Sequence, residues 1–270
     1  MAAPELVRRV SGGVRRRLRR PGPPVWFPAV EGRIHPHDDM RDPRDTSAAH
    51  YAKVGQSALE EIGGALEAAR RSFGEIGSCL DMPSGYGRVL RLLSREMPAA
   101  QITACDVNRE AIRFCASELG AMPLRSRGRL ETLRLGRYDL IWCGSLITHL
   151  DDRRVEQLLR HFANALMPGG VAVLTIHGDP PDESDPTYGP LARPVRAALA
   201  SGGSFHVPYV GALHDYGPRL AHEGAPQWGV RPGIGRRGWA AELQPPRLGT
   251  SIRTCSSFGA GPDSRPDATT

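Results

Sequence analysis

The sequence predicts an α/β fold in which a doubly wound, mainly parallel sheet carries helices on both faces. Short, continuous apolar runs alternate with amphipathic helical patterns between residues 46 and 176. The runs end at Pro, Gly or Asp residues, and 40% of the chain is hydrophobic, which is enough to bury a core. Because continuous apolar strands are typical of parallel sheets, helices are expected to cover both faces.

The elements follow in a regular order. A helix with one apolar face is expected first, from about Thr46 to Arg71. Five strands are predicted at Ile76–Met82, Gln101–Cys105, Met122–Leu124, Tyr138–Cys143 and Val171–Ile176. Helices between them are expected at Arg88–Glu96, at Asn108–Leu119 and from Asp151 or Asp152 to about Leu166.

Both ends of the chain differ in composition from this core. Residues 1–45 are rich in Arg, Pro, Asp and Gly and are predicted to form a mostly flexible arm, so the folded domain is expected at 46–217. Residues 218–270 contain eight Gly and seven Pro, which predicts a disordered tail. No convincing strand pair follows Tyr216, so the C-terminal sheet edge is expected to be incomplete. The abrupt change suggests a divergent or frame-shifted terminus.

The net charge of +6 lies in the first 20 residues, where seven Arg face the single acid Glu5. Such an arm either contacts nucleic acid or anionic membrane, or is a solvated tail. A His-Pro-His-Asp-Asp run, beginning at His35, resembles a metal-ligand cluster but is expected to be simply exposed. No apolar run is long enough to cross a bilayer.

The five cysteines are scattered and include no C-x-x-C pair: Cys79, Cys105, Cys115, Cys143 and Cys255. This pattern argues against a disulfide framework or a zinc site and suits a cytoplasmic protein. No metal is expected. Four of the cysteines fall in predicted strands or helix faces, where a free thiol packs as a small hydrophobic group.

The loop after the first strand has the character of a nucleotide-cofactor site. Gly85 and Gly87 allow a ligand to approach the backbone, and Asp81 precedes them. A pyrophosphate loop needs a third glycine where Leu90 stands, and Asp81 would repel the phosphates. A carboxylate there attracts the sulfonium and ammonium of S-adenosylmethionine. Asp106, at the end of the second strand, suits the ribose hydroxyls.

At these motifs the sequence resembles the class I S-adenosylmethionine-dependent methyltransferases, which have a Rossmann-like fold. The resemblance extends over about 49–217 and is carried by four segments in family order: Leu80–Gly87, Ile102–Asn108, Tyr138–Leu150 and Leu166–Val171. Pro83 stands where the family's first motif glycine is expected, so the loop is predicted to be stiffer. The family's sheet usually ends with two further strands, the last antiparallel.

The resemblance implies a role for each matching residue. Asp81 would lie at the methionine end of the cofactor and Asp106 at the ribose; both carboxylates also suit a structural role, accepting local N–H groups or opening a helix. Pro83, Gly85 and Gly87 would form the loop, Val107 and Asn108 would flank the adenosine, and Gly144 and Ser145 would line the floor near the methyl.

The resemblance implies methyl transfer from S-adenosylmethionine to a small-molecule or glycan acceptor. A nucleic-acid methyltransferase and a non-catalytic interaction module with this fold are the alternatives. His149 or His177 is the candidate base, and His149 is equally suited to packing beside the next helix. In the family, acceptor specificity usually lies beyond the fourth and fifth strands, which here is the segment Gly178–Gly217. Its aromatic residues either form the wall of an acceptor pocket or simply cover the sheet.

Overall fold

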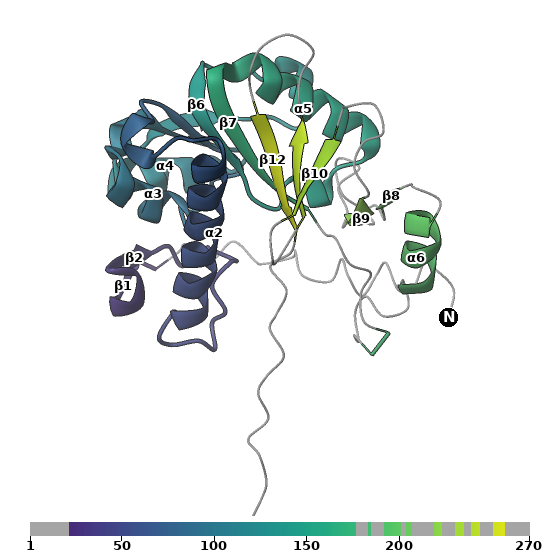
Figure 1. Ribbon diagram of the computed structural model, residues 1–270. Helices are drawn as coiled ribbons and strands as arrows, with labels where there is room; N and C mark the ends of the chain where they lie inside the picture. The colour runs from purple at the N-terminus through teal and green to yellow at the C-terminus, as the bar shows by residue number, and fades with distance from the viewer. Residues whose placement is uncertain are drawn as a thin grey trace, which may run out of the picture.

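The computed structural model describes residues 22–176 and seven shorter segments, 183–184, 192–200, 204–206, 219–222, 230–234, 239–243 and 251–256. Its centre is a parallel sheet of five strands in the order β7-β6-β3-β4-β5 (Figure 1). The strands are β3 (Cys79–Asp81), β4 (Ile102–Asp106), β5 (Met122–Arg125), β6 (Tyr138–Cys143) and β7 (Leu166–Ile176). This order reverses beside β3, so the predicted doubly wound sheet is confirmed.

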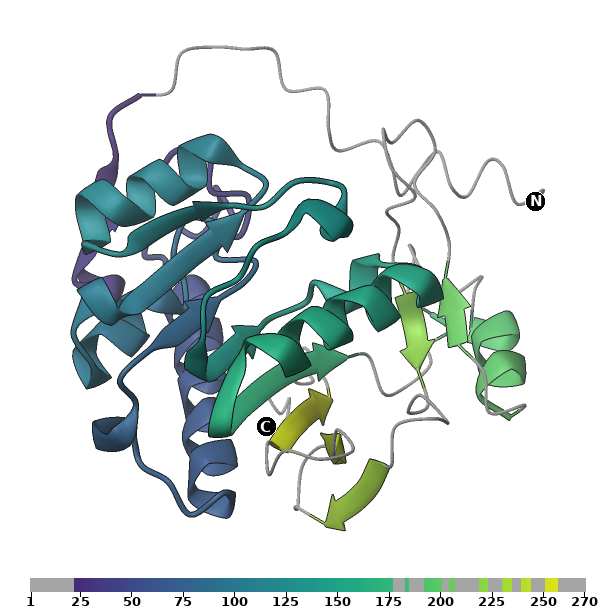
Figure 2. The ribbon, with the colours of Figure 1, turned by 90° about the horizontal axis from the view of Figure 1, so that it is seen from above.

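Four helices cover the sheet: α2 (Ala49–Ala68), α3 (Leu90–Glu96), α4 (Arg109–Leu119) and α5 (Asp152–Ala165). Alternate strand residues face different core clusters. Cys79 packs with residues of α2, α3 and α4, whereas Leu80 packs with α5. Both faces of the sheet are therefore buried, and Figure 2 shows α5 running along β7 when the molecule is seen from above.

The helix ends follow the predicted capping chemistry. Asn108 accepts the backbone N–H groups of Glu110 and Ala111 at the start of α4, and Gly120 ends that helix with a φ of 72°. The side chain of Asp151 accepts the N–H of Arg154 at 2.8 Å, which makes Asp151 the N-cap of α5. The start of α4 thereby fixes the position of the residues that follow β4.

The prediction of a flexible arm is wrong for the part of residues 1–45 that the structure describes. Strands β1 (Val25–Phe27) and β2 (Gly32–Ile34) form an antiparallel hairpin. Phe27, Val30 and Ile34 are buried against Tyr51 of α2. The Tyr51 hydroxyl donates a hydrogen bond to Asp38 at 2.7 Å. Apolar residues spaced through a polar segment thus anchor it to α2, and residues 1–21 lie outside the described chain.

The expected absence of strands after Tyr216 is also wrong. Beside β7 the sheet continues through β12 (Ser251–Ser256), β11 (Trp239–Leu243) and β10 (Val230–Ile234). β12 pairs parallel to β7, and β11 pairs antiparallel to β12. The tail's high Gly and Pro content hides these short pairings, because a ladder needs only backbone partners along β7. The other residues of 218–270 lie outside the described segments.

A smaller unit lies beyond α5. The helix α6 (Ala192–Ala200) accompanies β8 (Ser204–His206) and β9 (Arg219–His222), which pair with each other antiparallel (Figures 1 and 2). β9 contacts the 3-10 helix Ile147–His149 that follows β6. Among the described helices, none is long and apolar enough to span a bilayer.

Four of the five cysteines are free and buried, as expected: Cys79, Cys105, Cys115 and Cys143. Burial raises the pKa of the Cys105 and Cys115 thiols to about 12. These thiols therefore stay protonated at neutral pH and pack as small hydrophobic groups. Cys255 lies in β12.

Candidate functional site

A cavity of about 250 Å³ opens at the carboxyl ends of β3, β4 and β6. This is the edge at which doubly wound sheets bind their ligands, beside the point where the strand order reverses. The lining comes from four parts of the chain: the segment before α2, α2 itself, the loop after β3, and the ends of β4 and β6. Of the predicted site residues, it includes Asp81, Pro83, Gly85, Asp106, Gly144, Ser145 and His149.

Asp81, the last residue of β3, has a carboxyl group in an unusual environment for an ionisable side chain. Its side chain is 1% exposed, and among the described residues its Oδ2 atom has no hydrogen-bond partner. Burial, reinforced by the nearby Asp106 carboxylate, raises the pKa of Asp81 well above its usual range. An unpaired buried carboxyl group is costly, and a cationic ligand would relieve that cost.

The two loop glycines have different roles. Gly85 has a φ of 49°, and a Cβ built on it would meet no described atom within 4 Å, so its open side faces the cavity that it lines. Gly87 has a φ of 82°, and a Cβ there would lie 2.5 Å from Cδ1 of Leu119. Gly87 does not line the cavity; it lets the loop pack against α4.

Asp106 holds the loop in place from the end of β4. Its Oδ2 accepts the N–H of Gly85 at 2.9 Å, and its Oδ1 accepts the N–H of Asn108 at 2.8 Å. The residue is buried but lines the cavity. A carboxylate offers about four acceptor positions, so two bonds leave capacity for ligand hydroxyls. The structural and the ligand-binding roles are therefore compatible.

Val107 and Asn108 lie apart from the cavity lining. Val107 is 52% exposed at the start of α4. The Asn108 side chain caps α4, and its amide donates to the Tyr86 hydroxyl at 3.4 Å. The structure thus gives Asn108 a structural role that the resemblance alone does not reveal.

The loop after β6 forms the opposite wall. Gly144 lies against the Trp142 ring, whose nearest atom would be 3.1 Å from an added Cβ. Ser145 adopts a left-handed φ of 61°, and its N–H donates to Oγ1 of Thr175 on β7 at 2.6 Å. The 3-10 helix Ile147–His149 then brings His149 to the cavity. His177, the other candidate base, lies outside the described residues.

Several cavity residues escaped the sequence analysis. Asp38 and Met40 belong to the segment expected to be flexible, and Val54 and Ala58 come from α2. Asp38 is 5% exposed, and burial raises the pKa of its carboxyl group. Asp38 belongs to the His-Pro-His-Asp-Asp run, which was the one feature of the sequence that could have indicated a functional role for this segment.

Arg88, at the end of the glycine loop, is the cation of this cavity. Its Nε is buried and has no hydrogen-bond partner among the described residues. Burial lowers the pKa of the guanidinium, whereas Tyr51, Asp38 and Asp81 raise it. Two residues that each leave a buried polar atom unpaired, Asp81 and Arg88, therefore line one cavity.

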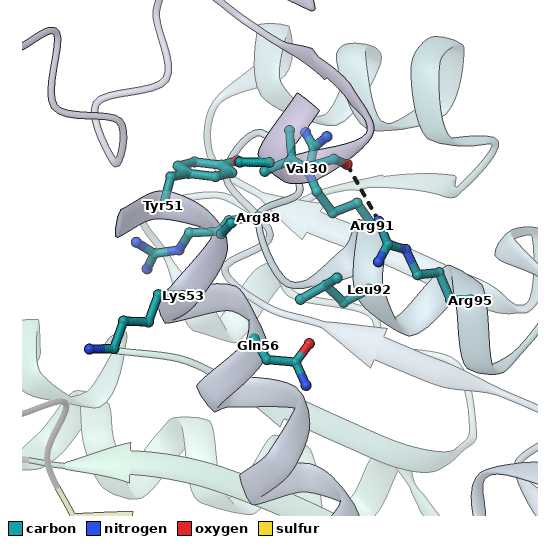
Figure 3. A pocket seen from close by; sticks show the side chains of 10 residues that line it. Val30, Tyr51, Lys53, Gln56, Arg88, Arg91, Leu92 and Arg95 are labelled. Carbon is teal, nitrogen blue, oxygen red and sulfur yellow. Dashed lines mark hydrogen bonds between the residues drawn. The ribbon is translucent and has the colours of Figure 1, made fainter. Parts of the chain in front are cut away.

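A second hollow, of about 210 Å³, lies between α2 and α3 and shares Arg88 (Figure 3). Its charged residues are Lys53, Arg88, Arg91 and Arg95. Figure 3 shows Lys53 and Arg88 extending to one side, whereas Arg95 turns the other way and donates to the carbonyl of Val30 at 3.5 Å. Because these charged ends diverge, we assign no ligand to the second hollow.

Residues 80–172 match the family model described as a methyltransferase domain. The match begins in β3, includes the glycine loop and ends in β7, so it covers the strands that build the cavity. The predicted likeness of this segment to a methyltransferase domain is therefore confirmed. Domains of this family take S-adenosylmethionine as the methyl donor. The buried carboxyl group of Asp81, which a cationic ligand would stabilise, fits this cofactor.

No curated protein matches the chain. Among solved structures, DesVI of Streptomyces venezuelae is 21% identical, with a TM-score of 0.40, over 52% of this chain and 59% of its own. The plantazolicin methyltransferase BpumL, solved with SAH, is 20% identical, with a TM-score of 0.35, over 47% of this chain and 51% of its own. DhpI, in a complex with SAM and HEP, is 17% identical, with a TM-score of 0.41, over 65% of this chain and 78% of its own.

The residues around the cavity fit the two ends of an amino acid. The methionine part of the cofactor carries an ammonium and a carboxylate, and the cavity is lined by the acid Asp81 and the cation Arg88, each with an unpaired buried polar atom. Gly85 leaves open space beside the loop. The donor set and the space therefore suit the cofactor that the family match implies.

Proposed function

We propose that this protein transfers a methyl group from S-adenosylmethionine to a small-molecule or glycan acceptor. One observation carries the proposal: the buried, unpaired Oδ2 of Asp81 in the cavity at the carboxyl edge of the sheet. A cationic ligand turns this cost into binding energy, whereas the phosphates of a dinucleotide would add to the repulsion. The family match of residues 80–172 supports the same cofactor.

The proposed contacts follow from the cavity lining. Asp81 accepts the ammonium, and Arg88 meets the carboxylate of the methionine part. Gly85 lets the ligand approach the loop, with Pro83 beside it, and Asp106 uses its remaining lone pairs for the ribose hydroxyls. Gly87 and Asn108 support the loop rather than touch the ligand, and the exposed Val107 flanks the adenosine.

The bound cofactor supplies an already activated methyl, so alignment of the acceptor accounts for much of the rate. Gly144 and Ser145 form the wall against which the acceptor is positioned. Met40, Trp142 and Leu146 contribute apolar lining to the cavity. His149 is placed to take the proton from an acceptor hydroxyl or amine.

The acceptor side is proposed at the unit formed by α6, β8 and β9. The contact of β9 with the 3-10 helix that carries His149, itself a lining residue of the cavity, supports this proposal. Most of the segment 178–217 lies outside the described residues. The acceptor is therefore assigned by class only, as a small molecule or a glycan.

Isothermal titration of the full-length protein with S-adenosylmethionine, S-adenosylhomocysteine and NAD tests the proposal. We expect the first two ligands to bind with dissociation constants on the order of micromolar, about −8 kcal/mol, and NAD not to bind. Absence of binding by both methionine-derived ligands at high micromolar concentration would overturn it. Acceptors are then sought by mass spectrometry of metabolite and glycan extracts incubated with the protein and the labelled donor.

A further inference from the structure

Two histidines of the segment before α2 have a structured environment that the methyl-transfer site does not use. His35 is 8% exposed and stacks on the Tyr86 ring with 4.5 Å between the ring centres. The edge of Phe114 closes its other side at 5.3 Å. His37 lies two residues on and is about one-third exposed. The sequence-based expectation that this pair is simply exposed is therefore wrong for His35.

Glu110, in the first turn of α4, joins the two histidines. Its Oε2 lies 2.9 Å from Nδ1 of His37, and its Oε1 lies 4.0 Å from Nε2 of His35. The three residues each offer one ligand atom, and these atoms lie within 4.8 Å of one another. The Tyr86 hydroxyl donates to Oε2 of Glu110 at 2.7 Å and fixes the carboxylate from behind. This is the arrangement of ligands with an outer partner that metal sites use.

We propose that His35, His37 and Glu110 bind a divalent transition metal, with zinc the best fit, outside the cofactor cavity. Two imidazole nitrogens and one carboxylate oxygen are a donor set typical of zinc, cobalt and nickel rather than of magnesium or calcium. Zinc lies about 2.0–2.2 Å from such ligands, so the three atoms close inwards on binding. His37 and Glu110 are partly exposed, which gives the ion a path from solvent and leaves a coordination position for water.

Two existing hydrogen bonds oppose binding and limit the affinity. Nδ1 of His37 donates to Oε2 of Glu110 at 2.9 Å, and coordination through Nδ1 displaces that proton. The backbone N–H of His37 donates to Nδ1 of His35 at 3.2 Å, which leaves the ring proton of His35 on Nε2. Coordination through Nε2 moves that proton to Nδ1 and breaks the second bond. We therefore expect affinity on the order of micromolar rather than nanomolar.

The metal would fasten the segment before α2 to α4. Asp38 and Met40 follow His37 closely in the chain and line the cofactor cavity. A metal at the histidine pair holds one end of this wall against the start of α4. This role is structural and does not depend on which ligand the cavity binds.

Zinc titration of the full-length protein, purified without a histidine tag and stripped with chelator, tests the proposal. The wild-type protein is expected to bind one more zinc ion per chain than H37A or E110Q. Where a variant still binds zinc at this site, its dissociation constant is expected to be at least tenfold higher than that of the wild type. H50A is the matched control, because His50 is exposed at the start of α2, and it is expected to bind zinc like the wild type. Cobalt added in place of zinc is expected to give a visible absorption band that both variants lose.

Equal zinc stoichiometry and affinity in the wild type, H37A and E110Q would overturn the proposal, as would no binding by the wild type at about 100 µM zinc. Circular dichroism of the chelator-treated proteins shows whether each variant is folded. His37 and Glu110 are partly exposed, so both variants are expected to keep the wild-type melting temperature without metal. If one variant unfolds, the other decides the outcome.

Discussion

Replacing Asp81 with Asn tests whether the buried carboxyl group is kept for a cationic ligand at the expense of stability. The side chain is 1% exposed with an unpaired Oδ2, and the amide removes the charge while keeping the shape. We expect the ligand-free variant to be more stable than the wild type and to bind S-adenosylmethionine more weakly. A residue kept only to hold the fold would show the opposite change in stability.

The magnitudes follow from the environment of Asp81. The amide leaves a buried polar atom unpaired but removes the charge, so at a pH above the raised pKa of Asp81 the variant gains stability on the order of 1–3 kcal/mol. For a domain of this length that corresponds to a rise in melting temperature on the order of 5 °C. Losing a hydrogen bond to a charged group costs about 1.5–3 kcal/mol of binding, so the dissociation constant rises about ten- to hundredfold.

The pH dependence of the unfolding free energy is a second way to test the direction of the stability change. Burial and Asp106 raise the pKa of Asp81, so the stability it contributes is present below about pH 4 and is lost as the pH rises through the raised pKa. The stability difference between variant and wild type therefore grows as the pH rises. A cation prefers the ionised carboxylate, so wild-type affinity for S-adenosylmethionine increases with pH over the same window, and the variant lacks this increase.

Differential scanning calorimetry and isothermal titration measure both effects. Asp139→Asn is the matched control, because Asp139 lies on β6 outside the cavity and accepts the N–H of Gly77 and the hydroxyl of Ser78. That variant is expected to lose stability and keep its affinity. An Asp81→Asn protein with wild-type affinity, or with a lower melting temperature, would refute the reasoning.

Three further substitutions separate packing from binding, each measured by denaturant unfolding and ligand titration. Gly87→Ala is expected to cost about 2–4 kcal/mol, because its Cβ would lie 2.5 Å from a Leu119 methyl carbon, whereas Gly169→Ala, at a similar positive φ with open space, costs about 1 kcal/mol; equal losses would contradict the clash. Gly85→Ala is expected to match Gly169→Ala in stability and yet weaken S-adenosylmethionine binding, and unchanged affinity would remove Gly85 from the ligand contact. Tyr51→Phe is expected to cost about 1–3 kcal/mol by leaving Asp38 without its 2.7 Å bond, and an unchanged midpoint would show that the Asp38 contact adds no stability.

The central sheet was accessible from the sequence because its signals are local. Continuous apolar runs mark β3, β4, β6 and β7, and turn or capping residues mark their ends. The ligand edge follows from topology, since every parallel strand of such a sheet points its carboxyl end to the same side. Asp81 and Asp106 could be placed there by counting along the chain, without knowledge of any contact.

The wall before α2 was not accessible, because its stability comes from contacts distant in sequence. His37 meets Glu110 across 73 residues, and the guanidinium of Arg91 reaches the carbonyl of Arg33 across 58. No periodic pattern marks such a segment, since it follows the surface of α2 and α4 with irregular backbone. The strands after Tyr216 were missed for a related reason: β12 is recognisable only as a partner of β7, and β10 and β11 follow β12 in the sheet.

Three departures from local rules occur around the cofactor cavity, whereas others, such as the unpaired Nε of Arg91 and the left-handed φ of Arg70, lie elsewhere. Asp81 leaves a carboxyl oxygen unpaired, Arg88 leaves a guanidinium nitrogen unpaired, and Ser145 holds a left-handed φ that a glycine would adopt more easily. All three line the same cavity, although they come from different strand ends. Selection for stability alone would remove such features one by one, since each has a simple stabilising replacement. Their presence at one edge of the sheet is what binding a charged ligand requires, and it agrees with the cofactor site that the motif around Asp81 predicts.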